Sequence, residues 1–390
     1  MCVVSTDRIN RMGSYMEKDG IRYPIFVDDK LGIGEPETIR EMCWKMNTLE
    51  VTKKYTYNIK KGKTEWMMMK NSRKKNDEVE LELEVKSGKI GRTKQYKYHG
   101  DMYDDTGKNL SKIKHKESKL GIMITDIKTE ACEKKIGSAA LNVRLMLMEV
   151  VITPTVLCST ETWHNITKQE KQKINTIHHR ILTETLNLPK TTPYMGIISE
   201  LNILPFMDNI WMKKFMWYHR LLNSGDEREA KKVLLEQMQE NDNWYTELRE
   251  YADGCGIEIA AEWVKQKSYE QYKKLVKECI ESKVVTQLKE EKETKTKMRW
   301  TNPGRRQNYI TSCSVRDATD IMKLRLHMVT VRANYGGGTC RKCNMVEETT
   351  EHVVQCMTDG SDEAVEEWIE DVGWLKRTCR TFEQFQNLYD

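Results

Sequence analysis

Four residues with metal-binding side chains lie close together near the C-terminal end of the sequence and restrict the local fold strongly. Cys340, Cys343, His352 and Cys356 follow the spacing C-x2-C-x8-H-x3-C. The first pair can hold one ion through two thiolates, and His352 and Cys356 would share one face of a helix that starts at residues 349–351. A closed set of four sulfur and nitrogen ligands favours structural, tetrahedral Zn²⁺ and leaves no position for a substrate. The alternative is a group of reduced, buried cysteines beside an ordinary histidine.

A second candidate metal site lies at residues 24–34, where an apolar run leads into Asp28 and Asp29 and a Gly-containing turn follows. Adjacent residues on a plain strand point to opposite faces, whereas on the tight turn of a hairpin one carboxylate can face a metal while the other braces the turn. Carboxylates of this kind suit Mg²⁺, which also binds substrate phosphates. An Asp-Asp pair by itself is also common at a surface turn.

Further motifs follow these residues in a specific order. They are Asn-Ile-Lys-Lys-Gly-Lys-Thr-Glu-Trp-Met (58–67), Tyr-Lys-Tyr-His-Gly-Asp (96–101), Pro-Thr-Val-Leu (154–157), Glu-Thr-Trp (161–163) and Thr-x-Glu-His-x-x-x-Cys (349–356). Together with Phe-Val-Asp-Asp (26–29), they resemble the back half of a reverse transcriptase from non-LTR, LINE-like retrotransposons. In that family, similar motifs form the F/Y-x-D-D metal motif, a primer-gripping hairpin, the thumb and a C-terminal CCHC knuckle. The resemblance covers most of the chain.

The resemblance implies an RNA-directed DNA polymerase of a transposable element, with RNA or DNA as its partner. Asp28 and Asp29 would then be catalytic residues that hold Mg²⁺. Arg341 and Lys342, at the tip of the knuckle, would contact phosphates. The remaining nucleic-acid contacts implied by the resemblance are Lys61, Lys63, Tyr98 and Gly100.

The sequence also departs from the family pattern. A two-metal polymerase site needs a third carboxylate from an earlier palm strand. Only 25 residues precede Phe26, and the two aspartates among them, Asp7 and Asp19, do not follow an evident apolar strand. Lys30 replaces the apolar residue that is usual after the second Asp, and Cys158-Ser159 stand where Tyr-Gly is common. We therefore expect an N-terminally truncated remnant that is inactive alone, unless a partner protein supplies the missing palm and fingers.

Composition indicates an intracellular protein. With 38% hydrophobic residues and ten Trp the chain can form cores, and its net charge of +5 is only modestly basic. Eleven scattered cysteines do not form an evident disulfide framework. No signal peptide is visible, and Arg144, Glu149 and Pro154 interrupt the longest apolar stretch. We expect a nuclear or cytoplasmic protein, neither secreted nor in a membrane.

The pattern of residues predicts a mainly α fold with a small N-terminal α+β domain. Alternation of apolar residues and glutamates over 78–85 predicts a half-buried strand, paired in a hairpin with residues 89–98. Beyond residue 105 the apolar spacing is helical, and Thr167 and Glu170 form a capping-box pattern at one helix start. The predicted divisions are 1–105 (partial palm), 106–225 (helical thumb-like domain), 226–334 (helical connector), 335–360 (zinc knuckle) and 361–390 (C-terminal tail).

Some stretches are less specific. Residues 1–20 are predicted as a lead-in, with a helix remnant as one interpretation. Helices are predicted over 227–239, 244–252 and 259–282, and residues 285–298 as a solvated helix or linker.

Three interpretations remain open at this stage. The first is a reverse transcriptase remnant that still binds nucleic acid. The second is a repurposed zinc-containing helical interaction protein without a nucleic-acid role, and the third is a non-functional translation product that never folds stably.

The incomplete carboxylate set leads to a prediction about activity. The purified chain should not incorporate dNTPs on a primed RNA template in the presence of Mg²⁺, because removing one ligand of a two-metal site reduces the rate by orders of magnitude. A primer-extension assay checks this. RNA-templated, Mg²⁺-dependent extension by the chain alone would contradict the expectation.

Overall fold

The protein is described here from a computed structural model. The structure describes residues 2–5, 16–18, 21–23, 25–26, 29–33, 36–53, 56, 58–60, 63–68, 81–98, 101–133, 140–240, 243–358 and 370–389. For the residues up to Ile33 it describes only the backbone. The chain is mainly helical, as predicted, and every strand that these residues form lies before residue 105. Of the described helices, none is long and apolar enough to cross a membrane.

The chain forms two compact units, each built from three segments. The first unit contains Met1–Ser118, Ser159–Gln172 and Ile210–Val276, and the second contains Lys119–Cys158, Lys173–Asn209 and Lys277–Asp390. The predicted domains are consecutive ranges of the sequence, whereas each unit combines three separate segments. The identification of these domains as palm, thumb and connector stays a prediction. Four helices contain a boundary between the units: α2 (Leu110–Glu133), α5 (Lys168–Leu186), α7 (Phe206–Leu222) and α11 (Tyr269–Thr294).

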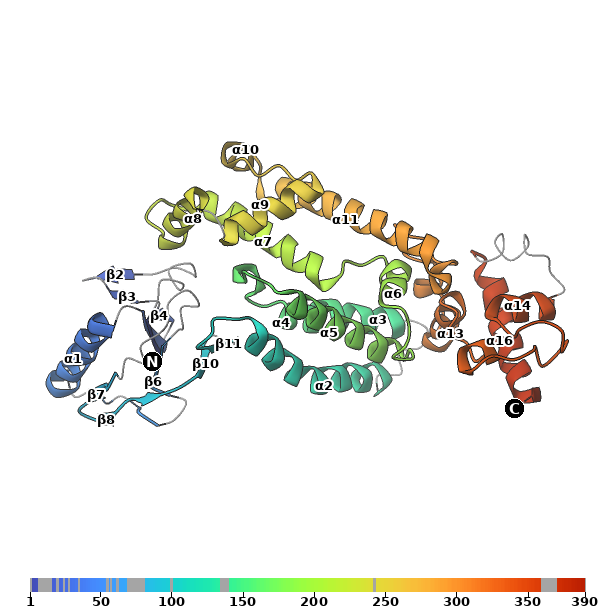
Figure 1. The fold of residues 1–390 in the computed structure, drawn as a ribbon, viewed down its shortest axis with the longest axis horizontal. Helices are drawn as coiled ribbons and strands as arrows, with labels where there is room; N and C mark the ends of the chain where they lie inside the picture. The colour runs from blue at the N-terminus through green and yellow to red at the C-terminus, as the bar shows by residue number, and fades with distance from the viewer. Residues whose placement is uncertain are drawn as a thin grey trace. The chain divides into compact units, whose positions relative to one another are not determined.

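A mixed sheet forms the N-terminal part of the first unit (Figure 1). Its strand order is β2-β3-β5-β1-β6-β9, and β4 pairs with β5 outside this path. The strands are β1 (Cys2–Ser5), β2 (Met16–Lys18), β3 (Ile21–Tyr23), β4 (Ile25–Phe26), β5 (Asp29–Ile33), β6 (Glu65–Met68) and β9 (Gly91–Arg92). The prediction of a loose lead-in over residues 1–20 was wrong, because β1 lies between β5 and β6 and runs parallel to both. Its Cys-Val-Val-Ser sequence contains two β-branched residues, which favour a strand.

Helix α1 (Pro36–Lys53) supplies one side of the N-terminal core. One face of the helix has apolar residues at helical spacing, and these are buried together with Trp66 of β6 and apolar residues of the following segment. The core consists of Ile39, Met42, Cys43, Met46, Trp66, Leu81, Leu83, Val85 and Ile90.

The described residues of this unit form four short hairpins. The predicted alternation is confirmed where it is described, since Leu81, Leu83 and Val85 are buried while Glu82 and Glu84 are exposed. Only β7 (Glu84–Val85) and β8 (Gly88–Lys89) form a regular ladder there. The predicted strand over residues 89–98 is divided into β8, β9 and β10 (Gln95–Tyr98). A hydroxyl of Thr93 bonded to the backbone of Gln95 separates the last two pieces. Strand β10 pairs with β11 (Asp101–Asp104), and the other two hairpins are β2–β3 and β4–β5.

Helices complete the first unit. The capping box is confirmed, because the Glu170 carboxylate accepts from the Thr167 backbone N–H (2.8 Å) and the Thr167 hydroxyl accepts from the Glu170 N–H (3.2 Å). Three helices follow α7, namely α8 (Glu229–Gln239), α9 (Trp244–Cys255) and α10 (Ala261–Lys265). The prediction of a single helix over 259–282 was wrong, because α10 ends at Lys265. A reciprocal cap between Ser268 and Gln271 starts a new helix, α11, instead.

In the described part of the second unit the regular elements are helices, apart from one β-bridge. Besides its parts of α2, α5, α7 and α11, they include α3 (Ala140–Leu147), the π-helix η2 (Met148–Ile152), α4 (Thr153–Val156), α6 (Tyr194–Leu201), α12 (Tyr309–Ser312), α13 (Val315–Arg325), α14 (Thr350–Thr358) and α16 (Val372–Tyr389). Helix α11 continues to Thr294, and of residues 285–294 only Leu288 is buried, so the solvated-helix alternative is confirmed for these residues and the linker alternative is wrong.

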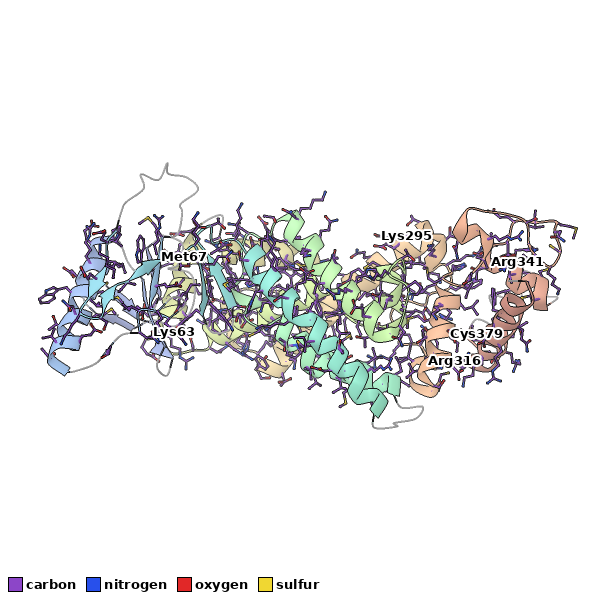
Figure 2. All side chains as sticks on the ribbon, turned by 90° about the horizontal axis from the view of Figure 1, so that it is seen from below. Lys63, Met67, Lys295, Arg316, Arg341 and Cys379 are labelled. Atoms are coloured by element: carbon purple, nitrogen blue, oxygen red, sulfur yellow. The ribbon has the colours of Figure 1, made fainter. Side chains whose placement is uncertain are left out.

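Helix α16 was not identified from the sequence, where this stretch was described only as a tail. It packs along α13, with Leu375 and Phe382 buried. Ion pairs join the two helices, between Arg316 and Glu383 and between Lys376 and Asp317 (3.6 Å). A groove of about 890 Å³ lies along this pair of helices, and Arg316 and Cys379 are among the residues that line it (Figure 2).

A buried ion pair joins α6 to α13 within the second unit. Arg325 donates from Nε to the Glu200 carboxylate at 2.9 Å, and both side chains are at most 1% exposed. The hydroxyl of Tyr309 donates to the same carboxylate oxygen at 2.5 Å. Burial and the neighbouring Glu200 charge raise the pKa of Tyr309, so its hydroxyl remains a donor. One carboxylate therefore holds together α6, α12 and α13.

This network predicts unequal costs of substitution. Glu200→Gln removes the buried carboxylate of Arg325 and leaves the guanidinium with the partly exposed Glu370 at 3.8 Å, so it should reduce the free energy of unfolding by about 3–5 kcal/mol. Tyr309→Phe removes one hydrogen bond and should cost about 1 kcal/mol. Denaturant unfolding of both variants measures the difference. Equal, small losses would show that the ion pair is not what joins these helices.

Candidate metal centre

The first two candidate ligands lie on a turn that a single β-bridge closes. Thr339 pairs with Glu347, and the Cys340 N–H donates to the Val346 carbonyl at 2.7 Å. Within the turn the Asn344 N–H donates to the Cys340 carbonyl at 2.8 Å. Asn344 has a φ of 57°, a left-handed conformation that Asn tolerates better than most residues. Cys340 and Cys343 are thereby held on one compact loop.

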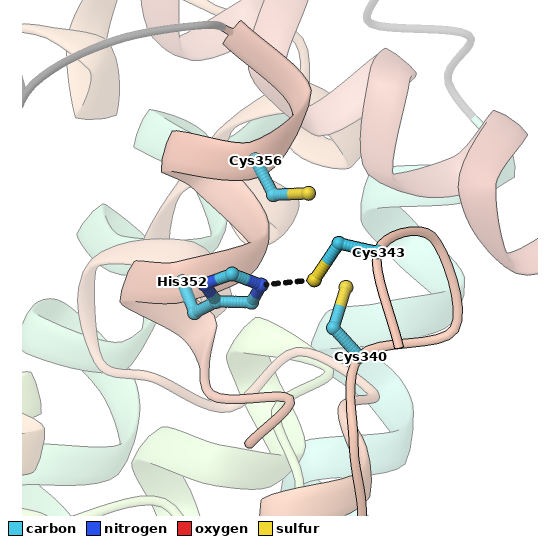
Figure 3. Close-up of side chains that lie close together, drawn as sticks. All are labelled: Cys340, Cys343, His352 and Cys356. Atoms are coloured by element: carbon cyan, nitrogen blue, oxygen red, sulfur yellow. Dashed lines mark hydrogen bonds between the residues drawn. The ribbon is translucent and has the colours of Figure 1, made fainter. Parts of the chain in front are cut away.

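The other two candidate ligands lie on α14. The Thr349 hydroxyl accepts from the His352 N–H at 3.1 Å, which confirms the helix start expected at residues 349–351. His352 and Cys356 are four residues apart and therefore lie on one face of the helix, directed towards the turn (Figure 3).

The four ligand atoms converge (Figure 3). They all lie within 4.8 Å of one another, and the Cys343 Sγ is 3.2 Å from the His352 Nε2. Cys340 is fully buried and the other three are half-buried. Among the side chains that the structure describes, this is the one group of Cys, His, Asp and Glu close enough to share a metal ion. The donor set and spacing fit a tetrahedral ion such as Zn²⁺.

The cysteines of this group differ in acidity. Backbone N–H groups of Met345 and Val346, followed by His352 and Cys340, lower the pKa of Cys343 to about 6. Burial, followed by the neighbouring sulfurs of Cys340 and Cys343, raises the pKa of Cys356 to about 11. Three thiolates so close together repel one another, and a bound cation removes that repulsion. Metal binding and loss of the thiol protons are therefore coupled.

The two cations between Cys340 and Cys343 are engaged within the turn and helix. Arg341 forms a bidentate pair with the buried carboxylate of Glu348, with a shortest distance of 2.9 Å. The Lys342 ammonium donates to the Cys356 carbonyl at 2.6 Å. Burial by itself raises the pKa of Glu348, but hydrogen bonds from the Arg341 side chain and from backbone N–H groups hold that pKa below its usual range. Sequence reasoning did not identify Glu348.

The other predicted site residues lie in the first unit. Asp28, Lys61 and Gly100 fall outside the described residues. Strand β4 pairs with β5 so that Phe26 is opposite Asp29, which is the hairpin that the sequence suggested around the acidic pair. The Asp29 side chain is not among those described.

Lys63 and Tyr98 are both described. Lys63 is exposed just before β6, and its carbonyl accepts from the Tyr96 hydroxyl at 2.8 Å. Tyr98 is half-buried at the end of β10, opposite Asp101. Lys63 is therefore tied to the β10–β11 hairpin that carries Tyr98.

Buried charges in the first unit were also missed by sequence reasoning. The Lys116 ammonium pairs with Asp101 at 2.9 Å, and both side chains are at most 7% exposed. Lys214 is fully buried, with its ammonium 4.3 Å from the Trp211 ring centroid and 3.2 Å from Glu247. Burial lowers the pKa of Lys214 to about 8, although Glu247 counteracts this. Neither pair has a sequence signal, because the partners are not at a helical spacing.

Comparisons of the chain with models of protein families, with curated proteins and with solved structures give no match.

The converging ligands lead to a prediction about metal content. The purified chain should contain one Zn²⁺ per molecule, and Cys340→Ser should abolish it, because this fully buried sulfur is one of only four ligands. Chelation should also lower the midpoint of thermal unfolding, since metal binding contributes to folding. Elemental analysis and a thermal melt measure both effects.

Cys158→Ser is the matched control, because Cys158 is exposed and lies outside the group. A metal content that is the same in Cys340→Ser and Cys158→Ser would exclude this metal centre.

Proposed function

We propose that this protein is a zinc-stabilised, nucleic-acid-binding remnant of a non-LTR retrotransposon reverse transcriptase that is inactive as a polymerase on its own. The observation that carries the proposal is the convergence of Cys340, Cys343, His352 and Cys356. These ligands belong to the last motif of the family order, and that order also contains the motifs at residues 26–29, 58–67 and 96–101. A nuclear or cytoplasmic location follows from the same proposal.

Hairpins and cations in the first unit support the nucleic-acid role. Lys94 and Lys97 are exposed on and beside β10, and the Tyr96 hydroxyl joins this strand to the exposed residue Lys63. Cations on adjacent loops and strands suit the regular charges of a phosphate backbone. Tyr98, at the end of the same strand, offers a ring for contact with sugar or base.

The strand register supports inactivity. Strand β1 is parallel to β5, and Val4 lies opposite Ile33. The carboxyl end of β1 is therefore level with the end of β5, whereas Asp29 begins β5. A strand that delivered a third carboxylate to Asp28 and Asp29 would have to end beside the first residue of β5, at the opposite end of that strand. On this proposal Mg²⁺ binds Asp28 and Asp29 only when another chain completes the site.

A second candidate function is a helical interaction protein with a structural zinc site. The observation that favours it is that Arg341 and Lys342 bond to Glu348 and to the Cys356 carbonyl, which belong to the knuckle itself. Met345 and Val346, which follow Cys343 in the turn, are 80% and 51% exposed, and apolar side chains of this kind suit a protein partner.

Salt dependence separates the two functions. Binding of a structured RNA should weaken steeply between about 50 and 200 mM salt, because each phosphate contact adds about 0.7–0.9 to the logarithmic slope. The double variant Lys63→Glu with Lys97→Glu should bind the RNA more weakly than the parent protein, and its affinity should depend less steeply on salt. Fluorescence anisotropy across a salt series measures both quantities.

Lys273→Glu with Lys277→Glu is the control, since it reverses the same charge on exposed positions of α11. No RNA binding at low salt, or equal effects of the two double variants, would contradict the proposed surface. Binding of a protein partner without salt dependence would favour the second function.

A further inference from the structure

The two residues between Cys340 and Cys343 extend to different parts of the metal centre. Arg341 is 9% exposed, and its Nε and Nη2 donate to both oxygens of Glu348, which is fully buried. Lys342 is exposed, and its ammonium reaches the carbonyl of Cys356 at the C-terminal part of α14. A cation at this end of a helix also interacts favourably with the helix dipole.

Glu348 makes further contacts with the backbone on both sides of the first ligand. Its Oε2 accepts from the Arg341 N–H at 2.9 Å, one residue after Cys340. Its Oε1 accepts from the Arg332 N–H at 3.0 Å, in the segment that leads into the turn. Because Glu348 also lies two residues before the start of α14, this carboxylate connects the entry, the turn and the segment that leads into the ligand-bearing helix.

We infer that Glu348, Arg341 and Lys342 are positioning residues of the metal centre, which hold the Cys340–Cys343 turn against α14 and are not contacts to nucleic acid. Arg341 fixes the turn to Glu348, two residues before α14, and Lys342 fixes it to Cys356, the last residue of the ligand set. This inference depends on the metal centre and not on the proposed binding of RNA.

The physical reason is preorganisation. A turn and a helix that move independently must lose conformational freedom when the ion binds, and that loss reduces affinity. Hydrogen bonds that fix the ligands beforehand remove part of this cost. Substitution of residues that orient metal ligands typically weakens metal affinity by about 10–100-fold.

The inference is tested by measuring zinc affinity of the full chain by competition with a chromophoric chelator, without nucleic acid. Glu348→Gln should weaken zinc binding by about 10–100-fold. Arg341→Lys keeps the charge but loses the bidentate geometry, and it should also weaken binding. Lys342→Ala should weaken it through the lost bond to Cys356. Glu347→Gln is the matched control, because Glu347 is the exposed neighbour of Glu348, and its affinity should be unchanged.

Two additional readouts separate positioning from general stability and from phosphate contact. The Co²⁺ absorption bands of Arg341→Lys and Lys342→Ala should shift or weaken, whereas the far-UV circular dichroism of the metal-free variants should match that of the parent protein. At saturating zinc, the salt slope for RNA should be unchanged in Lys342→Ala. Unchanged zinc affinity and Co²⁺ bands in both variants would overturn the inference, as would a slope reduced by about 0.7–0.9 at normal zinc affinity.

Discussion

Burial of charge is the constraint on which both units of this protein depend. A buried carboxylate is costly unless it receives hydrogen bonds or pairs with a cation, and the groups available are often far away in the sequence. Glu170 joins the start of α5 to the backbone of Asn109, and Glu200 joins α6 to Arg325. Glu348 does the same for the turn and helix of the metal centre. In each case one acidic side chain fixes the approach of two or more segments.

Local patterns were sufficient to predict many of these elements. The capping box of Thr167 and Glu170, the buried alternation at Leu81 and Leu83 and the spacing of the four metal ligands all depend on residues a few positions apart. Such patterns are readable because one helix turn or one strand pleat determines which side chains share a face. The start of α14 at Thr349 belongs to the same class.

Interactions over longer distances could not be predicted in this way. Glu200 and Arg325 are separated by 125 positions, and nothing in either neighbourhood indicates the other. Strand β1 was missed because four residues carry too little periodicity, and its assignment depends on pairing with β5 and β6. The internal partners of Arg341 and Lys342 were missed, because a sequence displays their charge but not the carboxylate and carbonyl that bind them; their role as phosphate contacts stays a prediction. The identity of their partners is a property of the fold.

The hydrogen bond from the Arg332 N–H to Glu348 closes the base of the loop that carries Cys340 and Cys343. This closure uses no metal ligand, so it does not require an ion. An ion that leaves the centre therefore leaves behind a loop whose two thiols are still adjacent and which Arg341 and Lys342 still join to Glu348 and to Cys356 of α14. Exchange of metal would then proceed through a site whose turn and helix stay together, without refolding of the region around each new ion.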